Sequence, residues 1–337
     1  MSTVDSIKTL QSRTGITVQI SDKGGAIRSV QAPDRNGRFS AICLEYGHLH
    51  DYIDDPAYFG VLIGRVANRI SNSRFTIDGK VYVLKPNEGA HHLHGGDAGL
   101  SRVDWKTNTG KDGAGEWIDL HHTSRDGTGG YPGNLSIHAR YQLSPTGCLS
   151  LSFSARTDQT TPVALTHHPY WNLAGTGSVH DHILQVFGEH LTEIDGDKLP
   201  TGRLSQVAGT PFDLRQPTRL GPVIEATGGL DHNYAIDGTV GQRRPAAVLY
   251  HPGSGRRLRI ETTLPGLQIY TGGGPSDRMD TTGKPFVPSG AICLEPQFFP
   301  DAVNQPHFAS PLLRPEDEWA HEIHCIFDVM DSNRAST

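Results

Sequence analysis

The sequence predicts an all-β protein, built as a large antiparallel β-sandwich or barrel. Short runs of β-forming residues alternate with turn residues along most of the 337-residue chain. Its 39 glycines and 22 prolines suit a fold with many turns and few long helices. The length would permit two domains, but large all-β architectures often stay single, and no linker, repeat or low-complexity tract divides the chain. We therefore expect one domain over 1–337, with its core at about 16–330.

Three hairpins follow in chain order. The run Phe75–Val83 places an Asp-Gly pair between two β-forming stretches, which is a strong signal for a tight hairpin turn. Leu135–Leu143 leads through a Ser-Pro-Thr-Gly turn into Leu149–Phe153. Ala246–Tyr250 leads through a Pro-Gly-Ser-Gly turn into Leu258–Ile260. Strands at this density indicate an antiparallel architecture.

Helical candidates are few and short. We expect helices at Val61–Ile70 and Leu220–Ala226. The stretch Leu184–Leu191 fits either a strand or a helix, because short apolar runs are ambiguous in their periodicity.

The charge of the chain argues against a nucleic acid or an anionic membrane as partner. There are 30 basic and 36 acidic residues, a net charge of −6, and no long run of either sign. Both kinds of partner require clustered Lys and Arg. Residues 1–15 contain no apolar segment of a signal peptide, and no run of about 18 apolar residues occurs. The expected location is the cytoplasm.

The four cysteines resemble reduced core residues. Cys43, Cys148, Cys293 and Cys325 stand far apart, and three of them lie in apolar runs. We therefore expect no zinc site formed by cysteines.

Two distant segments offer an acid and a base. Glu295 ends the apolar run that begins at Ile292, and a turn rich in polar and aromatic residues follows. Burial raises the pKa of a carboxyl group and makes it a better proton acceptor near neutral pH. His167 and His168 end another apolar run and precede two aromatic rings and an amide. Either segment alone has an ordinary structural interpretation, since a Glu at a strand end is commonly a solvated or capping residue.

Together with five further motifs, these segments closely resemble the aldose 1-epimerases, also called galactose mutarotases. The resemblance extends from about Gly24 to Phe327. Its motifs follow the family's order and are GRVANRI at 64–70, HLHGG at 92–96, GYPGNL at 130–135, THHPYWNLAG at 166–175, DHNY at 231–234, PGLQIYTG at 265–272 and LEPQFFPDAVNQP at 294–306.

The resemblance implies a fold and a reaction. The fold would be the galactose mutarotase-like supersandwich, with its site in an open cleft across one sheet. The reaction would be the interconversion of the α and β anomers of a free aldohexose of the galactose or glucose class, without cofactor or metal. In this interpretation Glu295 is the general base and His168 the general acid for ring opening and reclosure.

The same resemblance implies the residues that bind the sugar. His94 would hold the region of the ring oxygen, Asn68 and Arg69 would bind hydroxyls, Asp231 would accept from two hydroxyls, and Gln268 would lie near the base. The expected partner is a monosaccharide, bound by a monomer or a homodimer. The chain departs from the family pattern at two places around the cleft: His167 stands where we expect Asn in many relatives, and the chain reads TGGGPSDRM after Tyr270.

Several side chains have competing interpretations. His91, His92 and His94 form a His-rich tract that could bind Zn²⁺, although a catalytic zinc site usually has a third well-placed ligand. Arg65 is expected to be a surface salt-bridge partner. Aromatic residues near the motifs could form a sugar platform, but core packing is the commoner role of each; they are Tyr170, Trp171, Phe298 and Phe299.

Three other functions remain as alternatives. A glycoside hydrolase would need two carboxylates about 5–9.5 Å apart, with Asp231 as the nominal second one. A carbohydrate-binding protein of the same fold would have lost the catalytic groups, whereas this chain retains Glu295, His168 and His94. A phosphosugar epimerase would need an added basic cluster, and none is evident in the sequence. No glycine-rich fingerprint of a nucleotide site occurs.

Overall fold

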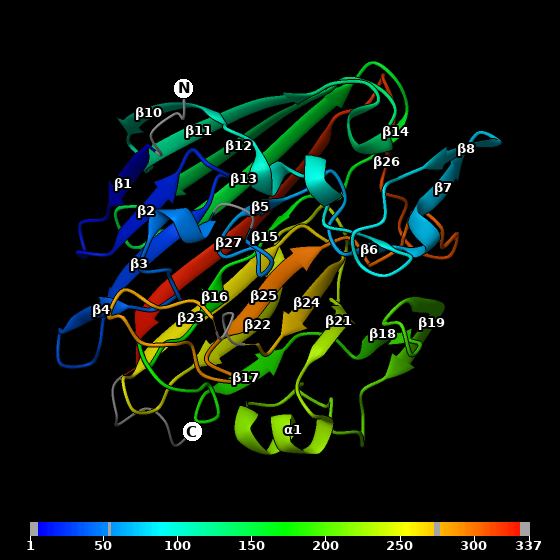
Figure 1. Cartoon of the computed structure of the whole chain (residues 1–337). Coiled ribbons are helices and arrows are strands. Elements are labelled where there is room, and N and C mark those ends of the chain that lie inside the picture. Colours follow the sequence, from blue (N-terminus) through cyan, green and yellow to red (C-terminus); the bar gives the residue numbers. More distant parts are fainter. Residues whose placement is uncertain (1–5, 53–54, 273–276, 331–337) are drawn as a thin grey trace.

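Antiparallel strands dominate the fold (Figure 1). The computed structural model describes residues 6–52, 55–272 and 277–330. Two large sheets form the body of the protein, and smaller sheets and strand pairs surround them. The prediction of an all-β sandwich is confirmed.

The larger sheet has nine strands, in the order β10-β11-β12-β13-β27-β23-β22-β17-β20. Along β12 the side chains alternate between buried and more exposed positions, as expected for a strand with one face on the core. Its strands are β10 (Lys106–Asp112), β11 (Gly115–Ser124), β12 (Leu135–Leu143), β13 (Cys148–Thr157), β17 (Ile183–Val186), β20 (Thr218–Arg219), β22 (Arg244–Tyr250), β23 (Arg256–Thr262) and β27 (Trp319–Val329).

The second sheet has six strands, in the order β16-β25-β24-β21-β18-β19. Its strands are β16 (Tyr170–Trp171), β18 (His190–Ile194), β19 (Pro200–Gln206), β21 (Asp231–Ala235), β24 (Gly266–Tyr270) and β25 (Ile292–Gln297).

The remaining elements are short. A four-stranded sheet consists of β1 (Ile7–Gln11), β2 (Thr17–Ser21), β3 (Ile27–Pro33) and β4 (Phe39–Ala41). The strand pairs are β15 (Thr166–His167) with β5 (Leu62–Ile63), β6 (Arg69–Ile70) with β9 (His92–Leu93), β7 (Arg74–Ile77) with β8 (Lys80–Val83), and β14 (Thr161–Pro162) with β26 (Leu312–Leu313). Helical turns are α1 (Leu220–Thr227) and the 3₁₀ turns Leu49–Tyr52, Ser71–Ser73, Gly96–Ala98, Leu100–Arg102 and Thr128–Gly130.

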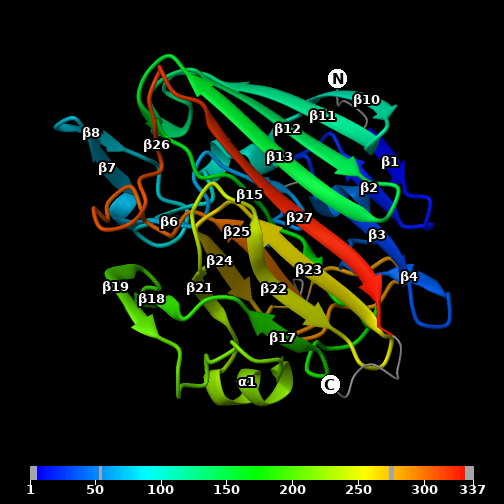
Figure 2. The same cartoon turned by 180° about the vertical axis from the view of Figure 1, so that it is seen from behind.

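The two large sheets pack face to face, as the front and back views show (Figures 1 and 2). One cluster of buried apolar side chains joins them and extends from Leu10 to Phe327. In β25, Ile292 and Leu294 belong to this cluster, whereas Cys293 belongs to a separate cluster with Tyr170. Successive residues of a strand point to opposite faces. The second face of the six-stranded sheet is therefore turned away from the main core.

Most of the predicted elements are present. The three hairpins form as β7–β8, β12–β13 and β22–β23. The helix predicted at Leu220–Ala226 is α1, which ends at Gly228 in the left-handed region with φ 73°. The ambiguous stretch 184–191 contributes to two strands, β17 and β18.

The helix predicted at Val61–Ile70 is wrong. Instead Leu62 and Ile63 pair with β15, and the N–H of Ala67 donates to the carbonyl of Ala164. The chain then turns at Asn68, whose φ is 63°. Pairing with a segment about 100 residues away has outweighed the local helical pattern, which is only a weak preference.

Within the described ranges, no helix is both long enough and apolar enough to span a bilayer.

Candidate active site

The free face of the six-stranded sheet forms the floor of the site. The register aligns Asn233 of β21, Gln268 of β24 and Glu295 of β25 in one row across the strands. Because side chains two residues apart share a face, Asp231 and Tyr270 lie on the same face as this row. Polar groups from three sequence motifs are thereby brought onto one surface.

A pocket of about 370 Å³ opens over this floor. All seven residues predicted for the site line it, and their roles remain predictions at this point. Its lining consists of Pro56, Ala57, Tyr58, Asn68, Arg69, Glu88, Leu93, His94, His168, Tyr170, Lys198, Asp231, Gln268, Tyr270 and Glu295.

Glu295 and His168 form a buried acid–base pair. Glu295 Oε1 lies 3.5 Å from His168 Nε2, and the two residues are 1% and 6% exposed. Glu295 Oε2 and His168 Nδ1 are buried without a hydrogen-bond partner in the protein. Burial raises the pKa of Glu295 well above its ordinary value, helped by the charge of Asp231, and lowers the pKa of His168 to about 4. Without a ligand, burial therefore favours the neutral forms of both groups.

His94 is held as a hydrogen-bond donor to the pocket. The ring Nδ1 of His94 accepts the backbone N–H of Asn68 at 3.1 Å, and the backbone N–H of His94 donates to the Asn68 carbonyl at 3.2 Å. Burial and the neighbouring His168 keep the pKa of His94 well below its ordinary value. A neutral imidazole whose Nδ1 accepts must carry its proton on Nε2.

Arg69 is oriented by Asn68 and Glu88. Asn68 Oδ1 accepts the backbone N–H of Arg69 at 2.9 Å, and Glu88 Oε2 lies 2.6 Å from the Arg69 Nε. The guanidinium also donates to Glu88 Oε1 at 2.8 Å. This two-point pairing fixes the plane of the guanidinium at the side of the pocket.

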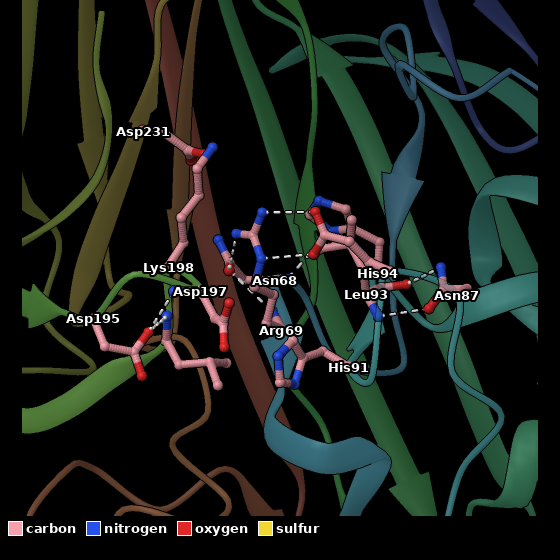
Figure 3. A network of polar contacts seen from close by, with 12 residues as sticks. Asn68, Arg69, Asn87, His91, Leu93, His94, Asp195, Asp197, Lys198 and Asp231 are labelled. Atoms are coloured by element: carbon pink, nitrogen blue, oxygen red, sulfur yellow. Dashed lines mark hydrogen bonds and ion pairs between the residues drawn. The ribbon is translucent and has the colours of Figure 1, made fainter. Parts of the chain in front are cut away.

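At the other side of the pocket, Asp231 is held by two donors. Gln268 Nε2 donates to Asp231 Oδ1 at 2.8 Å, and Lys198 Nζ lies 2.6 Å from Asp231 Oδ2. Figure 3 shows Lys198 extending to Asp231 from the turn that contains Asp195 and Asp197.

The sequence analysis did not single out several pocket residues, among them Tyr58, Glu88 and Lys198. Tyr58, with φ 57°, packs its ring 4.8 Å from that of His94. Glu88 lies in a polar turn before the His-rich tract, and Lys198 lies in another polar turn. A polar turn is ordinarily solvated, so the sequence carried no signal for the last two. Of the proposed aromatic platform, only Tyr170 lines the pocket, while Trp171 packs 5.7 Å from Phe327 in the core.

The prediction that Arg65 is a surface salt-bridge partner is wrong. Arg65 is 3% exposed, and its guanidinium donates to carbonyl and hydroxyl oxygens. The acceptors are the carbonyls of Ser124, Arg125, Pro132 and Gly133 and the hydroxyls of Ser124 and Thr161.

The His-rich tract does not converge on one point. His91 Nδ1 accepts the N–H of Asn72, and His92 Nδ1 contacts the carbonyl of Lys85, away from the contacts of His94. Within the described ranges a different group, His168, Cys293 and Glu295, has ligand atoms within 4.8 Å of one another. Burial raises the pKa of the Cys293 thiol well above its ordinary value, which disfavours the thiolate that a metal binds.

The comparison with known families agrees with this geometry. The sequence model described as "Aldose 1-epimerase" matches residues 6–325. The chain belongs to the aldose 1-epimerase family. It is 39% identical over 319 residues to the galactose mutarotase of Bos taurus, with 93% of this chain and 92% of that protein covered. It is 31% identical to the aldose 1-epimerase of Escherichia coli, with the same coverage.

Solved structures show the same fold. An aldose epimerase homologue from C. elegans superposes with a TM-score of 0.90 at 29% identity, covering 97% of this chain and 100% of that one. A galactose 1-epimerase from Lactobacillus acidophilus superposes with a TM-score of 0.82 at 25% identity, covering 96% and 94%. The resemblance inferred from seven motifs is confirmed, and so is the family's sandwich fold.

Proposed function

We propose that this aldose 1-epimerase family member interconverts the α and β anomers of a free aldohexose of the galactose or glucose class. The observation that carries the proposal is the buried pair of Glu295 and His168, which lies on the floor of a pocket lined by sugar-binding types of side chain. The names of its relatives, galactose mutarotase and aldose 1-epimerase, support the same reaction.

The reaction needs two coupled proton transfers. Glu295 takes the proton of the anomeric hydroxyl while His168 gives a proton to the ring oxygen, so that the bond between C1 and the ring oxygen breaks and an aldehyde forms. The aldehyde rotates about its bond to C2, and both transfers reverse on reclosure from the other face. No proton is gained or lost over the cycle.

The pair carries one proton in either stage of this cycle. The cyclic sugar meets an ionised Glu295 and a protonated His168, and the open-chain sugar meets a protonated Glu295 and a neutral His168. Burial favours the second, neutral arrangement in the free protein. The ionic arrangement then forms only as a minor state of the same pair, which titrates as a unit.

The other predicted residues would hold the sugar. His94 would donate from Nε2 toward the ring-oxygen region, and Arg69 and Asn68 would bind hydroxyls beside it. Asp231 would accept from hydroxyls at the opposite side, with Gln268 between it and Glu295. Fixed planar polar groups of this kind, next to the rings of Tyr58 and Tyr170, suit the recognition of a polyhydroxylated ring.

The alternative functions have less support. A glycoside hydrolase would need a second carboxyl group that donates a proton, yet Asp231 accepts from both Gln268 and Lys198. A phosphosugar enzyme would need cations free to meet a phosphate, whereas Arg69 and Lys198, which line the pocket, each pair with a carboxylate.

Polarimetry tests the reaction itself. Freshly dissolved α-D-glucose and α-D-galactose are followed with and without the protein, and the proposal expects faster approach to the anomeric equilibrium with protein. A rate that does not change with protein concentration, for either sugar, would refute it. The ratio of kcat/KM for the two sugars ranks them as substrates.

Chelation tests whether a metal takes part. The proposed transfers need no Lewis acid, so we expect full activity after EDTA treatment and no stoichiometric metal by elemental analysis. Activity lost on chelation and restored by Zn²⁺ would instead indicate a site at His168, Cys293 and Glu295, whose ligand atoms lie within 4.8 Å of one another in the pocket region.

Three expectations about the whole protein accompany the proposal. We propose that residues 1–337 form one domain, since one cluster of buried apolar side chains extends from Leu10 to Phe327. We also propose a cytoplasmic location and a monomeric or homodimeric state, which fractionation and light scattering would test.

A further inference from the structure

The turn between β18 and β19 is a tightly hydrogen-bonded loop. Asp195 Oδ1 accepts the backbone N–H groups of Asp197 and Leu199, at 2.9 and 3.0 Å. The N–H of Asp195 donates to the carbonyl of Leu199, and the N–H of Lys198 donates to the carbonyl of Asp195. An aspartate that satisfies the backbone in this way fixes the shape of a turn. The direction in which Lys198 leaves the turn is therefore set by the fold.

Lys198 occupies a backbone conformation that a lysine rarely adopts. Its φ is 62°, in the left-handed region that favours glycine. Such residues cluster at ligand sites in many proteins, where the surrounding structure maintains the strain. Four of the nine non-glycine residues with positive φ in the described part of the chain line the pocket; they are Tyr58, Asn68, His94 and Lys198. Lys198 thus shares an unusual feature with two residues already predicted to bind the sugar.

The contact of Lys198 with Asp231 is close but half exposed. Its Nζ lies 2.6 Å from Asp231 Oδ2, and the two side chains are 51% and 22% exposed. An ion pair with this exposure contributes little to folding stability. Stability therefore gives no adequate reason for holding a lysine in a strained turn, whereas a role toward a ligand in the pocket does.

The contacts of Asp231 define what a ligand would meet. Oδ1 is engaged by Gln268 and Oδ2 by Lys198, so a hydroxyl that reaches Oδ2 also meets the ammonium group. A hydroxyl can donate its proton to the carboxylate and accept from the ammonium at the same time. Hydrogen bonds to charged groups are stronger than those between neutral groups.

We propose that Lys198 is a further substrate-binding residue, which together with Asp231 holds one secondary hydroxyl of the sugar ring. The inference rests on the proposed function and adds a specificity-determining residue to it. The strand of Asp231 lies two strands from that of Glu295, roughly 10 Å across the sheet at the usual strand spacing. The hydroxyl is therefore not the anomeric one but a secondary hydroxyl of the ring, at C2, C3 or C4.

A panel of deoxy sugars tests this assignment. Initial mutarotation rates are measured for D-glucose and its 2-, 3- and 4-deoxy analogues with the wild-type protein and with Lys198→Met. In the wild type we expect one analogue to show a KM about 10- to 100-fold higher than glucose, because a charge-assisted contact is lost. We call this ratio of KM values the deoxy penalty. In Lys198→Met it should shrink by at least about fivefold, with the main change in KM rather than in kcat.

Two further variants at the same position separate the ammonium group from the turn. Lys198→Gly removes the side chain and suits a positive φ, so the turn should persist while the deoxy penalty shrinks as in Lys198→Met. Lys198→Arg keeps the positive charge and should retain most of the penalty. Lys111→Met is the matched control, because Lys111 forms a 3.0 Å pair with Glu116 away from the pocket; its sugar profile should equal that of the wild type.

The outcomes separate this inference from the proposed function. If the wild type catalyses mutarotation but Lys198→Met and Lys198→Gly keep the wild-type deoxy profile within about twofold, the role of Lys198 is refuted and the function stands. If the wild type is inactive on every aldose, the function fails. Calorimetric titration with glucose and its analogues then tests the contact directly, and absence of binding, or an equal profile in the variants, overturns the inference as well.

Discussion

Two regions of buried polar groups differ in their hydrogen bonding. Around Arg65 every nitrogen of the guanidinium donates to an oxygen of the protein. On the floor of the pocket, Glu295 Oε2 and His168 Nδ1 have no partner in the protein, and the side-chain amide atoms of Asn233 and Gln297 on the same sheet also lack one.

The difference separates buried groups that the protein itself satisfies from buried groups of the pocket that it leaves open to a ligand. A buried polar group without a partner costs folding free energy, so satisfied groups predominate in protein interiors. Local exceptions concentrate at functional sites, where a ligand completes the contacts. We therefore assign Arg65 to the framework and propose that Glu295 and His168 serve the chemistry. Substitutions in the two regions should separate stability from activity.

The largest expected effect is on stability, from Arg65→Met. Loss of the guanidinium leaves four carbonyl oxygens without its hydrogen bonds. Each unsatisfied group costs about 1–3 kcal/mol of folding free energy. We expect the free energy of unfolding to fall by at least about 4 kcal/mol, measured by urea denaturation. Arg156→Met is the control, because its ion pair with Glu318 is exposed. A loss of unfolding free energy no larger than that of Arg156→Met would show that Arg65 does not support the framework.

Glu295→Gln should have the opposite pattern. The variant keeps the size of the side chain but removes the base, so the rate of anomer conversion should fall by roughly 10²- to 10⁴-fold. Stability should change little, because the amide replaces a carboxyl group that burial already favours in its neutral form. Polarimetry and urea denaturation of the same preparation measure both. A variant with the wild-type rate, or with a loss of stability like that of Arg65→Met, would break the comparison.

His168→Asn should change the shape of the pH profile as well as the rate. In the wild type we expect a bell-shaped kcat/KM, bounded on the acid side near pH 4 by His168 and on the alkaline side by the raised pKa of Glu295. Without His168, only ionisation of Glu295 is required. The alkaline limb should disappear, because in the wild type it marks the loss of the pair's one proton, which His168 must donate. In the variant, the rate should instead rise with pH through the raised pKa of the Glu295 carboxyl group. Initial rates, corrected for buffer catalysis, give the profile.

An alkaline limb that persists unchanged in His168→Asn would contradict the assignment of the acid. His94 would then be the next candidate, since its imidazole lies 5.6 Å from that of His168, centre to centre.

The smallest predicted effect concerns His167, which is buried beside the pair. Burial lowers its pKa to about 3, and neither ring nitrogen has a partner in the protein. A depressed histidine pKa gives stability that is present above the unfolded value of about 6.5 and is lost as the pH falls toward the folded value. Between pH 7 and 5 this amounts to about 2 kcal/mol. His167→Asn should reduce the fall in stability over this range by that amount, measured by urea denaturation.

His307→Asn is the matched control, because His307 is exposed. An equal pH dependence in His167→Asn and the wild type would show that the His167 imidazole gains no protection from protons in the folded state.

Local sequence signals determined the hairpins and much of the site. The Asp78-Gly79 turn of β7–β8 needs only adjacent residues, and so do the turns of β12–β13 and β22–β23. The family motifs carried Glu295, His168 and His94, and the fold assembles them although they come from distant parts of the chain. Residues 273–276, within the unusual stretch after Tyr270, lie outside the described residues.

Only the tertiary structure decided which polar residues are enclosed. Arg65 and Arg69 stand four residues apart in one motif, yet one lies among backbone carbonyls and the other beside the pocket with Glu88. Leu62 and Ile63 pair with β15 instead of starting a helix over Val61–Ile70, and Lys198 reaches Asp231 from a turn that looks solvated in the sequence. Turn chemistry depends on neighbouring residues, and the sequence contains them. Burial and partner choice depend on segments about 30 to 100 residues away, which only folding brings together.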